Sequence, residues 1–164
     1  YLERLGADFD KGLNAADRAS ARAFVRMADE HMYFHQVLDR WGNDAVWAVI
    51  RDTYFDMIPR VLRGFVTGKM RKALMQGMHA QGLGRFSEAE RLERLEHDLA
   101  AIAARLEEQR FLFGDTPCSA DASVASVLGG MRASPVPTAQ SKRIGDDSTL
   151  SRYIDEMAKE LPIL

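Results

Sequence analysis

The amino-acid sequence predicts an all-α fold, a bundle of six or seven helices, on three observations. Apolar residues recur at spacings of three and four along most of the 164 residues. Residue types that begin and end helices stand at the borders of these segments. No segment shows the alternation of polar and apolar residues that is typical of a half-buried strand. We therefore expect helices from about Ala15 to the neighbourhood of Pro162.

The composition is that of an ordinary globular domain, with 46% hydrophobic and 28% charged residues. A net charge of −2 gives no general reason to expect nucleic acid or an anionic membrane as a partner. The single cysteine, Cys118, excludes an internal disulfide framework and a zinc site with several cysteines. No apolar run approaches the ~20 residues of a membrane span. These features favour a cytoplasmic protein without a bound metal.

The first predicted helix is long. Asn14 is a typical N-cap residue, and Gly42 a typical residue at which a helix ends. Between them, apolar residues at spacings of three and four indicate one continuous helix from about Ala15 to Trp41 with one buried face.

Two further helices follow. Asn43 begins a second helix, and Pro59, which suits the first turn of a helix but not its interior, begins a third. The segment AQGLGRFS ends the third helix. Each internal glycine weakens a helix by roughly 1 kcal/mol relative to alanine, so this helix is expected to bend or break. The glycines concerned are Gly64, Gly68 and Gly77.

The fourth helix carries the clearest start signal. Ser87 and Glu90 form a capping box, in which each side chain bonds the backbone amide of the other residue. Leucines at regular spacing then extend the helix to about Gln109. A further helix, from about Ser119 to Met131, is small or apolar all round and is therefore expected to be buried.

The last part of the chain is predicted as a loop and a helix. Pro135 and Pro137 interrupt the helical pattern, and the polar residues after them indicate a loop. Ser148 or Thr149 can cap a final helix that ends near Pro162.

Asp121 opens the predicted buried helix within the segment FLFGDTPCSAD, and no other charge follows until Arg132. The first four amides of a helix have no partner inside it, and little water reaches them at the entrance to a core. A carboxylate in the first turn accepts their bonds and faces the positive end of the helix dipole. We therefore interpret Asp121 as a structural N-cap, not as a catalytic acid or a metal ligand.

This arrangement resembles the C-terminal domain of glutathione S-transferases, in which an FL-x-G turn precedes a Ser/Thr-x-x-Asp cap on the central helix. The segments RMADEHMYFHQVLDRW, QGLGRFSEAE and LSRYIDEM are similar to the failed-axon-connections and metaxin branch of that superfamily. One departure is Cys118 at the Ser/Thr position. Because sulfur is a poor acceptor, either Ser119 caps the helix in a shifted register or Asp121 carries the cap alone.

The resemblance also implies a partner domain. In this superfamily an N-terminal thioredoxin-like domain holds glutathione, and nothing similar occurs here. The first residues, YLERLGADF, are similar to the last helix of that domain. We therefore expect residues 1–14 to be a remnant of this helix plus a linker, and 15–164 to be the all-α domain. Glutathione is implied for the parent protein, with no cofactor bound by this chain alone.

The resemblance places the first long helix along the cleft between the two domains. His31 and His35 lie four residues apart on it, which would suit a metal, but two histidines alone make a weak site. They are better interpreted as core or pocket-lining residues. On the implied placement, the candidate substrate-binding residues are Arg26, His31, Tyr33, Phe34, His35 and Trp41. No catalytic residue is assigned to this chain.

Residues 57–86 hold six lysines and arginines and no acid. Such a segment is compatible with a basic amphipathic helix on an anionic membrane. A solvated face balanced by the glutamates of residues 88–93 is the favoured interpretation, so a membrane surface is not expected as a partner. Superfamily members commonly dimerise through the first helices of this domain, which makes a homodimer a further expectation.

Two functions remain open. The first is the part of a glutathione transferase that binds a small hydrophobic co-substrate, inactive without its N-terminal domain. The second is a non-catalytic module that kept the fold and serves contacts with proteins or a membrane surface.

Overall fold

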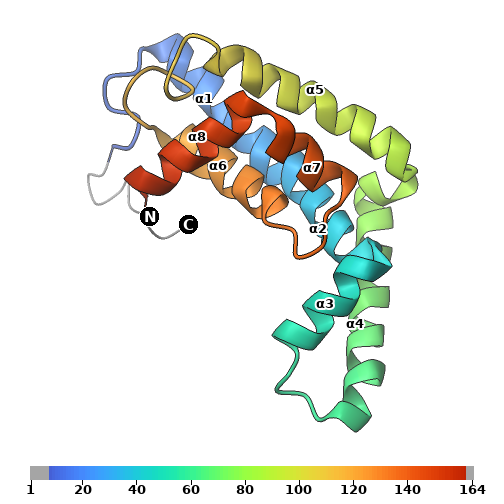
Figure 1. Ribbon diagram of the computed structural model, residues 1–164. Coiled ribbons are helices and arrows are strands. Elements are labelled where there is room, and N and C mark those ends of the chain that lie inside the picture. Colours follow the sequence, from blue (N-terminus) through green and yellow to red (C-terminus); the bar gives the residue numbers. More distant parts are fainter. Residues whose placement is uncertain (1–7, 162–164) are drawn as a thin grey trace.

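The computed structural model describes residues 8–161, and these form helices joined by turns (Figure 1). The helices are α1 (Ala15–Met27), α2 (Tyr33–Gly42), α3 (Asp44–Tyr54), α4 (Arg60–Gln81), α5 (Glu88–Leu106), α6 (Ser119–Arg132), α7 (Ala139–Asp146) and α8 (Ser148–Glu160). A π-helical turn, Ala28–Met32, joins α1 to α2, and a 3₁₀ turn, Leu83–Arg85, follows α4. Since α1, the π-helical turn and α2 are continuous, the described residues form seven helices, and the all-α prediction is confirmed.

Several helix starts follow directly from the sequence. The side chains of Asn14 and Asn43 accept hydrogen bonds from the first amides of α1 and α3. The capping box of Ser87 and Glu90 is present at the start of α5. Helix α4 continues as one helix past its three glycines, so the expected break does not occur. Helix α5 ends at Leu106, one turn before the predicted end.

The predicted loop after Pro137 is wrong, because residues 139–146 form helix α7. Thr138 and Ser141 make a capping box at its start, which gives this short helix a local signal. Apolar periodicity did not predict this helix, because Ile144 is the only large buried apolar residue of α7. Helix α8 is capped by Asp147, one residue before the predicted serine or threonine, through the amides of Thr149 and Leu150.

Helix α6 lies at the centre of the bundle, where it packs against α1, α2, α7, α8 and the π-helical turn. Its small residues allow these neighbours to approach closely. One continuous apolar core surrounds it. The fully buried larger side chains of this core are Met32, Leu95, Leu99, Ile102, Leu106, Phe111, Leu112, Leu128, Met131, Ile144, Leu150 and Tyr153.

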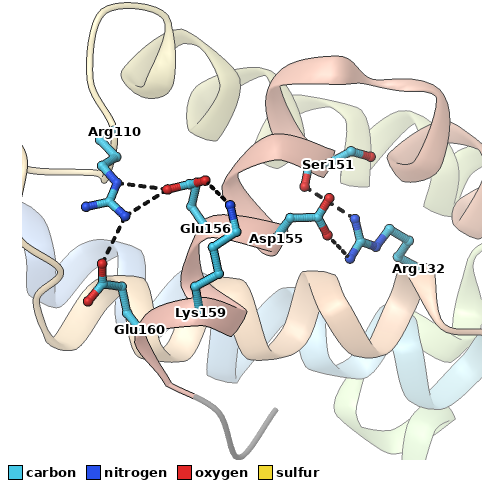
Figure 2. Close-up of polar contacts among 7 residues, drawn as sticks. All are labelled: Arg110, Arg132, Ser151, Asp155, Glu156, Lys159 and Glu160. Carbon is cyan, nitrogen blue, oxygen red and sulfur yellow. Dashed lines mark hydrogen bonds and ion pairs between the residues drawn. The ribbon is translucent and has the colours of Figure 1, made fainter.

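Helix α8 is also held at the surface by ion pairs, which Figure 2 shows. The guanidinium of Arg110 donates to Glu156 and Glu160, at 2.8 and 2.9 Å. Arg132, the last residue of α6, donates to Asp155 at 2.7 Å. Because these side chains are partly exposed, each pair contributes only about 0–1 kcal/mol, and the apolar core carries the packing.

Helix α3 and the first half of α4 project from the bundle as an arm (Figure 1). A small apolar cluster at its base contains Val46, Trp47 and Ile50, with the ring of Trp41 stacked on that of Trp47. The rest of the arm makes few contacts with the bundle. We define the arm as residues 44–72.

The chain before α1 contacts the bundle at two points. Asp8 pairs with Arg18 on α1, at 2.9 Å. Asp10 accepts a hydrogen bond from the backbone amide of Ser119, at 3.0 Å. The predicted helical remnant at Tyr1–Leu5 lies outside the described residues. The division into residues 1–14 and 15–164 stays a prediction.

Candidate functional site

The N-terminus of α6 is built around Asp121, whose side chain is fully buried. One carboxylate oxygen accepts hydrogen bonds from the backbone amide of Leu112 at 2.8 Å and from the hydroxyl of Tyr153 at 2.9 Å. The other accepts from the backbone amide of Cys118 at 2.9 Å. Three donors compensate the desolvation of one buried carboxylate. Asp121 therefore joins the turn, the central helix and α8.

Cys118 is the N-cap residue of α6, but its side chain makes no capping hydrogen bond there. Burial, with the nearby carboxylate of Asp121 as the second cause, raises the pKa of the Cys118 thiol to about 12. The thiol is therefore protonated at neutral pH and is a poor nucleophile. Asp10, which the sequence analysis did not single out, accepts from the Ser119 amide and completes the polar cap.

Two of the candidate substrate-binding residues meet in one cluster. His31, in the π-helical turn, contacts Asp98 of α5, with 2.5 Å between Nδ1 and Oδ2. His35, in the first turn of α2, lies beside His31, with 3.4 Å between their Nε2 atoms and the rings edge to face. A neutral His31 that donates from Nδ1 to Asp98 presents a lone pair on Nε2, which the Nε2–H of His35 can approach.

Burial differs across this cluster. His35 is only 4% exposed, and burial lowers its pKa to about 3, aided by the charges of His31, Arg91 and Arg94. Burial also raises the pKa of Asp98, while the hydrogen bond from His31 opposes that rise. The His31 side chain is one-third exposed. His31 is therefore the member of the cluster that solvent or a ligand reaches, and His35 and Asp98 stand behind it.

Asp98 is the residue of the cluster that sequence reasoning missed. It lies 67 residues after His31, so no local spacing connects the two. A signal was present, since Asp98 directly precedes Leu99 in the apolar stripe of α5. A carboxylate at the margin of such a stripe requires a buried polar partner. The π-helical turn is a second feature that apolar periodicity does not predict, and such turns are frequent at functional sites.

A cavity of about 20 Å³ adjoins the cluster and is lined by His35, Asp39, Arg91 and Gln140, among others. The Nε2 of Gln140 is buried and has no hydrogen-bond partner among the described residues. Burial raises the pKa of Asp39, although Thr138 donates a hydrogen bond to it. A polar cavity of this volume has room for a water molecule but not for a substrate.

The other candidate residues lie elsewhere, so the six do not form one pocket. Arg26 is exposed and pairs with Glu30. Tyr33 is about half exposed, with its ring edge against Phe34, which packs on a second small core around Leu38. Trp41 belongs to the aromatic cluster at the base of the arm.

The segment Gly82-Leu83-Gly84-Arg85 is a helix end and not a phosphate loop. Gly82 has a φ of +121° and follows the last residue of α4, which explains a glycine there. Gly84 serves a different need, because a Cβ at this position would lie 2.7 Å from the backbone carbon of Met78. Arg85 donates to the carbonyl of His79 and so caps the same helix.

Within residues 8–161 there is no group of three or more histidine, cysteine or acidic side chains arranged to hold a metal ion. None of the helices in this range is both long enough and apolar enough to cross a bilayer.

Comparison with known proteins agrees with this fold. The sequence model of the family "Glutathione S-transferase, C-terminal domain" matches residues 95–157, which run from α5 into α8. The chain is 31% identical to the isoprene-epoxide–glutathione S-transferase of Rhodococcus sp. (strain AD45), over 99% of this chain and 70% of that protein. It is 29% identical to metaxin-1 of Sus scrofa and of Homo sapiens, over 83% of this chain.

The chain spans less than half of these metaxins, 44% of the Sus scrofa protein and 30% of the human one. No solved structure matches. The family match and the similarity over most of the Rhodococcus enzyme agree with the central α6 and its buried Asp121 cap. This chain belongs to the glutathione S-transferase family and carries the C-terminal domain of that family.

Proposed function

We propose that this chain is the co-substrate-binding domain of a glutathione transferase, whose glutathione is held by a thioredoxin-like domain outside this sequence. The observation that carries the proposal is the cluster of Asp98, His31 and His35. His31 is partly exposed and contacts the carboxylate of Asp98, and it lies on the helix that the family resemblance implies to run along the cleft between the domains. Such a pair can hold a proton or release it to a neighbouring oxygen.

The co-substrate class that fits is a small hydrophobic electrophile that gains negative charge as it reacts. An epoxide, which the name of the Rhodococcus relative specifies for that protein, has this property. The glutathione thiolate would attack a carbon, the carbon–oxygen bond would break, and the released oxygen would take up a proton. His31 is the partly exposed acid–base group of the cluster, and in its doubly protonated form, with Nδ1–H donating to Asp98, its Nε2–H would supply that proton. Tyr33 and Phe34, beside His31, would form an apolar wall of the co-substrate site.

The buried thiol of Cys118 and the absence of any other cysteine are consistent with a reducing cytoplasm. A non-catalytic module is the second candidate function, favoured by the similarity to metaxin-1. The sequence of the whole parent protein discriminates the two. A serine, tyrosine or cysteine at the start of the first thioredoxin-like helix, with a cis-proline motif, supports the enzyme.

The test has two arms. This chain alone is expected to bind glutathione no more tightly than millimolar and to show no turnover, and calorimetric binding at micromolar concentration would contradict that. In the full-length protein, H31Q should lower kcat for an epoxide at least tenfold while the KM for glutathione stays unchanged. The matched control is H79Q, on the exposed face of α4. Equal rates for the two variants would exclude His31 from the reaction.

A further inference from the structure

The far end of the arm exposes large apolar side chains that no part of the described chain covers. The exposed fractions are 71% for Tyr54, 86% for Met57, 89% for Val61 and 65% for Phe65. The connection between α3 and α4 is the part of the arm farthest from the bundle in Figure 1. Exposed apolar side chains grouped in this way indicate an interaction surface rather than scattered surface residues.

Apolar and cationic side chains follow one another along a single face of α4. Val61, Phe65, Lys69 and Lys72 are three or four residues apart and therefore share this face, and all four are exposed. The Nζ of Lys69 lies 4.3 Å from the centre of the Phe65 ring. The apolar pair is nearer the tip, and the lysines lie behind it toward the bundle.

The same tip carries an open cleft of about 940 Å³ between α3 and α4, with Arg51, Arg60 and Arg63 among its lining residues. Arg51 pairs with Asp52, and Arg63 donates to the backbone carbonyls of residues 56 and 58. Arg60 makes no ion pair within residues 8–161. The tip therefore combines an apolar surface with one arginine, Arg60, able to meet phosphate, beside the carboxylates of Asp52 and Asp56 in the same cleft.

The glutamates expected to balance these charges lie at the end of α4 that is remote from the tip. Glu88, Glu90 and Glu93 lie beyond the C-terminal end of α4, and this helix of 22 residues is about 33 Å long. No ion pair between described residues joins them to α4. Arg71 is the exception among the cations, because its guanidinium donates to Asp44 and to the carbonyl of Gly42 and is not available to a partner.

These observations discriminate between partners. In a two-fold dimer through this face, the lysines Lys69 and Lys72 would meet the same face of the other copy, and no acidic residue within residues 57–86 would offset their charges. An anionic phospholipid surface offers phosphate groups for the cations and an acyl layer for the apolar side chains. We propose that the tip of the arm docks on an anionic phospholipid membrane, with Met57, Val61 and Phe65 in the interface and Arg60, Lys69 and Lys72 against the headgroups.

This proposal is independent of the proposed function, because the arm tip contains none of the groups of the histidine cluster. The test is co-sedimentation of the full chain with vesicles of phosphatidylcholine alone or with 30% phosphatidylserine, a mixture on the order of that in anionic leaflets. Binding is expected only to the anionic vesicles, and it should weaken as salt rises.

Two double variants separate the contributions. K69E with K72E should lower the partition coefficient at least about 20-fold, because each cation near an anionic surface contributes roughly fivefold. V61S with F65S should leave only weak, strongly salt-sensitive binding. The matched control, R22E with K142E, makes the same change in net charge on the bundle and should shift binding less than about twofold. Circular dichroism checks that every variant keeps its helices.

Three results would overturn the proposal. One is no sedimentation of the unaltered chain with anionic vesicles. Another is an equal loss of binding in K69E with K72E and in the control, which would indicate net charge alone. The third is a dimer in analytical ultracentrifugation that V61S with F65S dissociates, which would assign the tip to self-association.

Discussion

Asp121 shows how strongly the stability of the fold can depend on one side chain. It is fully buried, and its three donors come from the preceding turn, from the N-cap residue and from α8. The family pattern places an acid here, and the structure gives the reason in terms of bonds. Without a carboxylate, two backbone amides and one hydroxyl would remain buried without an acceptor, which is costly for each group.

We expect D121N to destabilise the domain by about 2–4 kcal/mol, because the new amide presents a donor to groups that are themselves donors. Urea unfolding monitored by circular dichroism measures the change. Y153F, which removes a single donor, should cost about 1–2 kcal/mol. D115N, at an exposed position of the same loop, serves as the control. A D121N protein as stable as D115N would show that the carboxylate does not support the fold.

At the scale of elements, the arm depends on one arginine. Arg71 of α4 donates to the carbonyls of Trp41 and Gly42, which are among the unpaired carbonyls at the end of α2. It also pairs with Asp44 at the start of α3, at 2.7 Å. Its side chain therefore links α4 to the end of α2 and to the start of α3 at the base of the arm.

R71M keeps the alkyl stem and removes these bonds, so it should destabilise the arm by about 2 kcal/mol. The loss should be local, because the main core around α6 does not include these helices. Hydrogen exchange is the suitable measurement, with faster exchange expected for the amides of α3 and unchanged exchange for α6. K72M is the neighbouring control. Uniform protection in R71M would show that packing of Trp47 alone holds the arm.

The sequence predicted those elements whose signals are local. Caps at Asn14, Asn43 and Ser87 and the leucine stripe of α5 gave the correct helices, because each depends on residues within a few positions. Helix α7 was not predicted because its sequence has no apolar periodicity. Its buried residues are covered by neighbouring helices. Asp98 and His31 are 67 residues apart in the sequence, and no rule based on local spacing predicts their contact.

At the scale of the whole molecule, buried ionisable groups link stability to pH. The pKa of His35 is about 3 in the folded chain, against an ordinary value of 6.5. Between these values the unfolded chain binds a proton at this residue and the folded chain does not. Stability is therefore lost as pH falls through this range. Asp39 and Asp98, whose pKa values are raised by burial, act in the opposite direction near the acid end.

We expect the free energy of unfolding to decrease from pH 7 toward pH 4, and H35Q to flatten this dependence. The contribution of one group cannot exceed about 1.4 kcal/mol per pH unit. Urea unfolding of both proteins at several pH values gives the difference that belongs to His35. H79Q should keep the original slope, since His79 is exposed. Parallel curves for H35Q and the unaltered protein would contradict the assignment.

The bonds of Asp121 also bear on the order in which the chain acquires its shape. They span 3 residues to Cys118, 9 residues to Leu112 and 32 residues to Tyr153, so the first turn of the central helix acquires its full set of bonds only when α8 is in place. Closing such loops is entropically costly until other contacts compensate it. We expect α5, which starts from its own capping box, to form early. We expect α6 to adopt its final position only when α8 packs against it. A polypeptide leaving the ribosome would then reach its final topology only after nearly all of this domain has been synthesised.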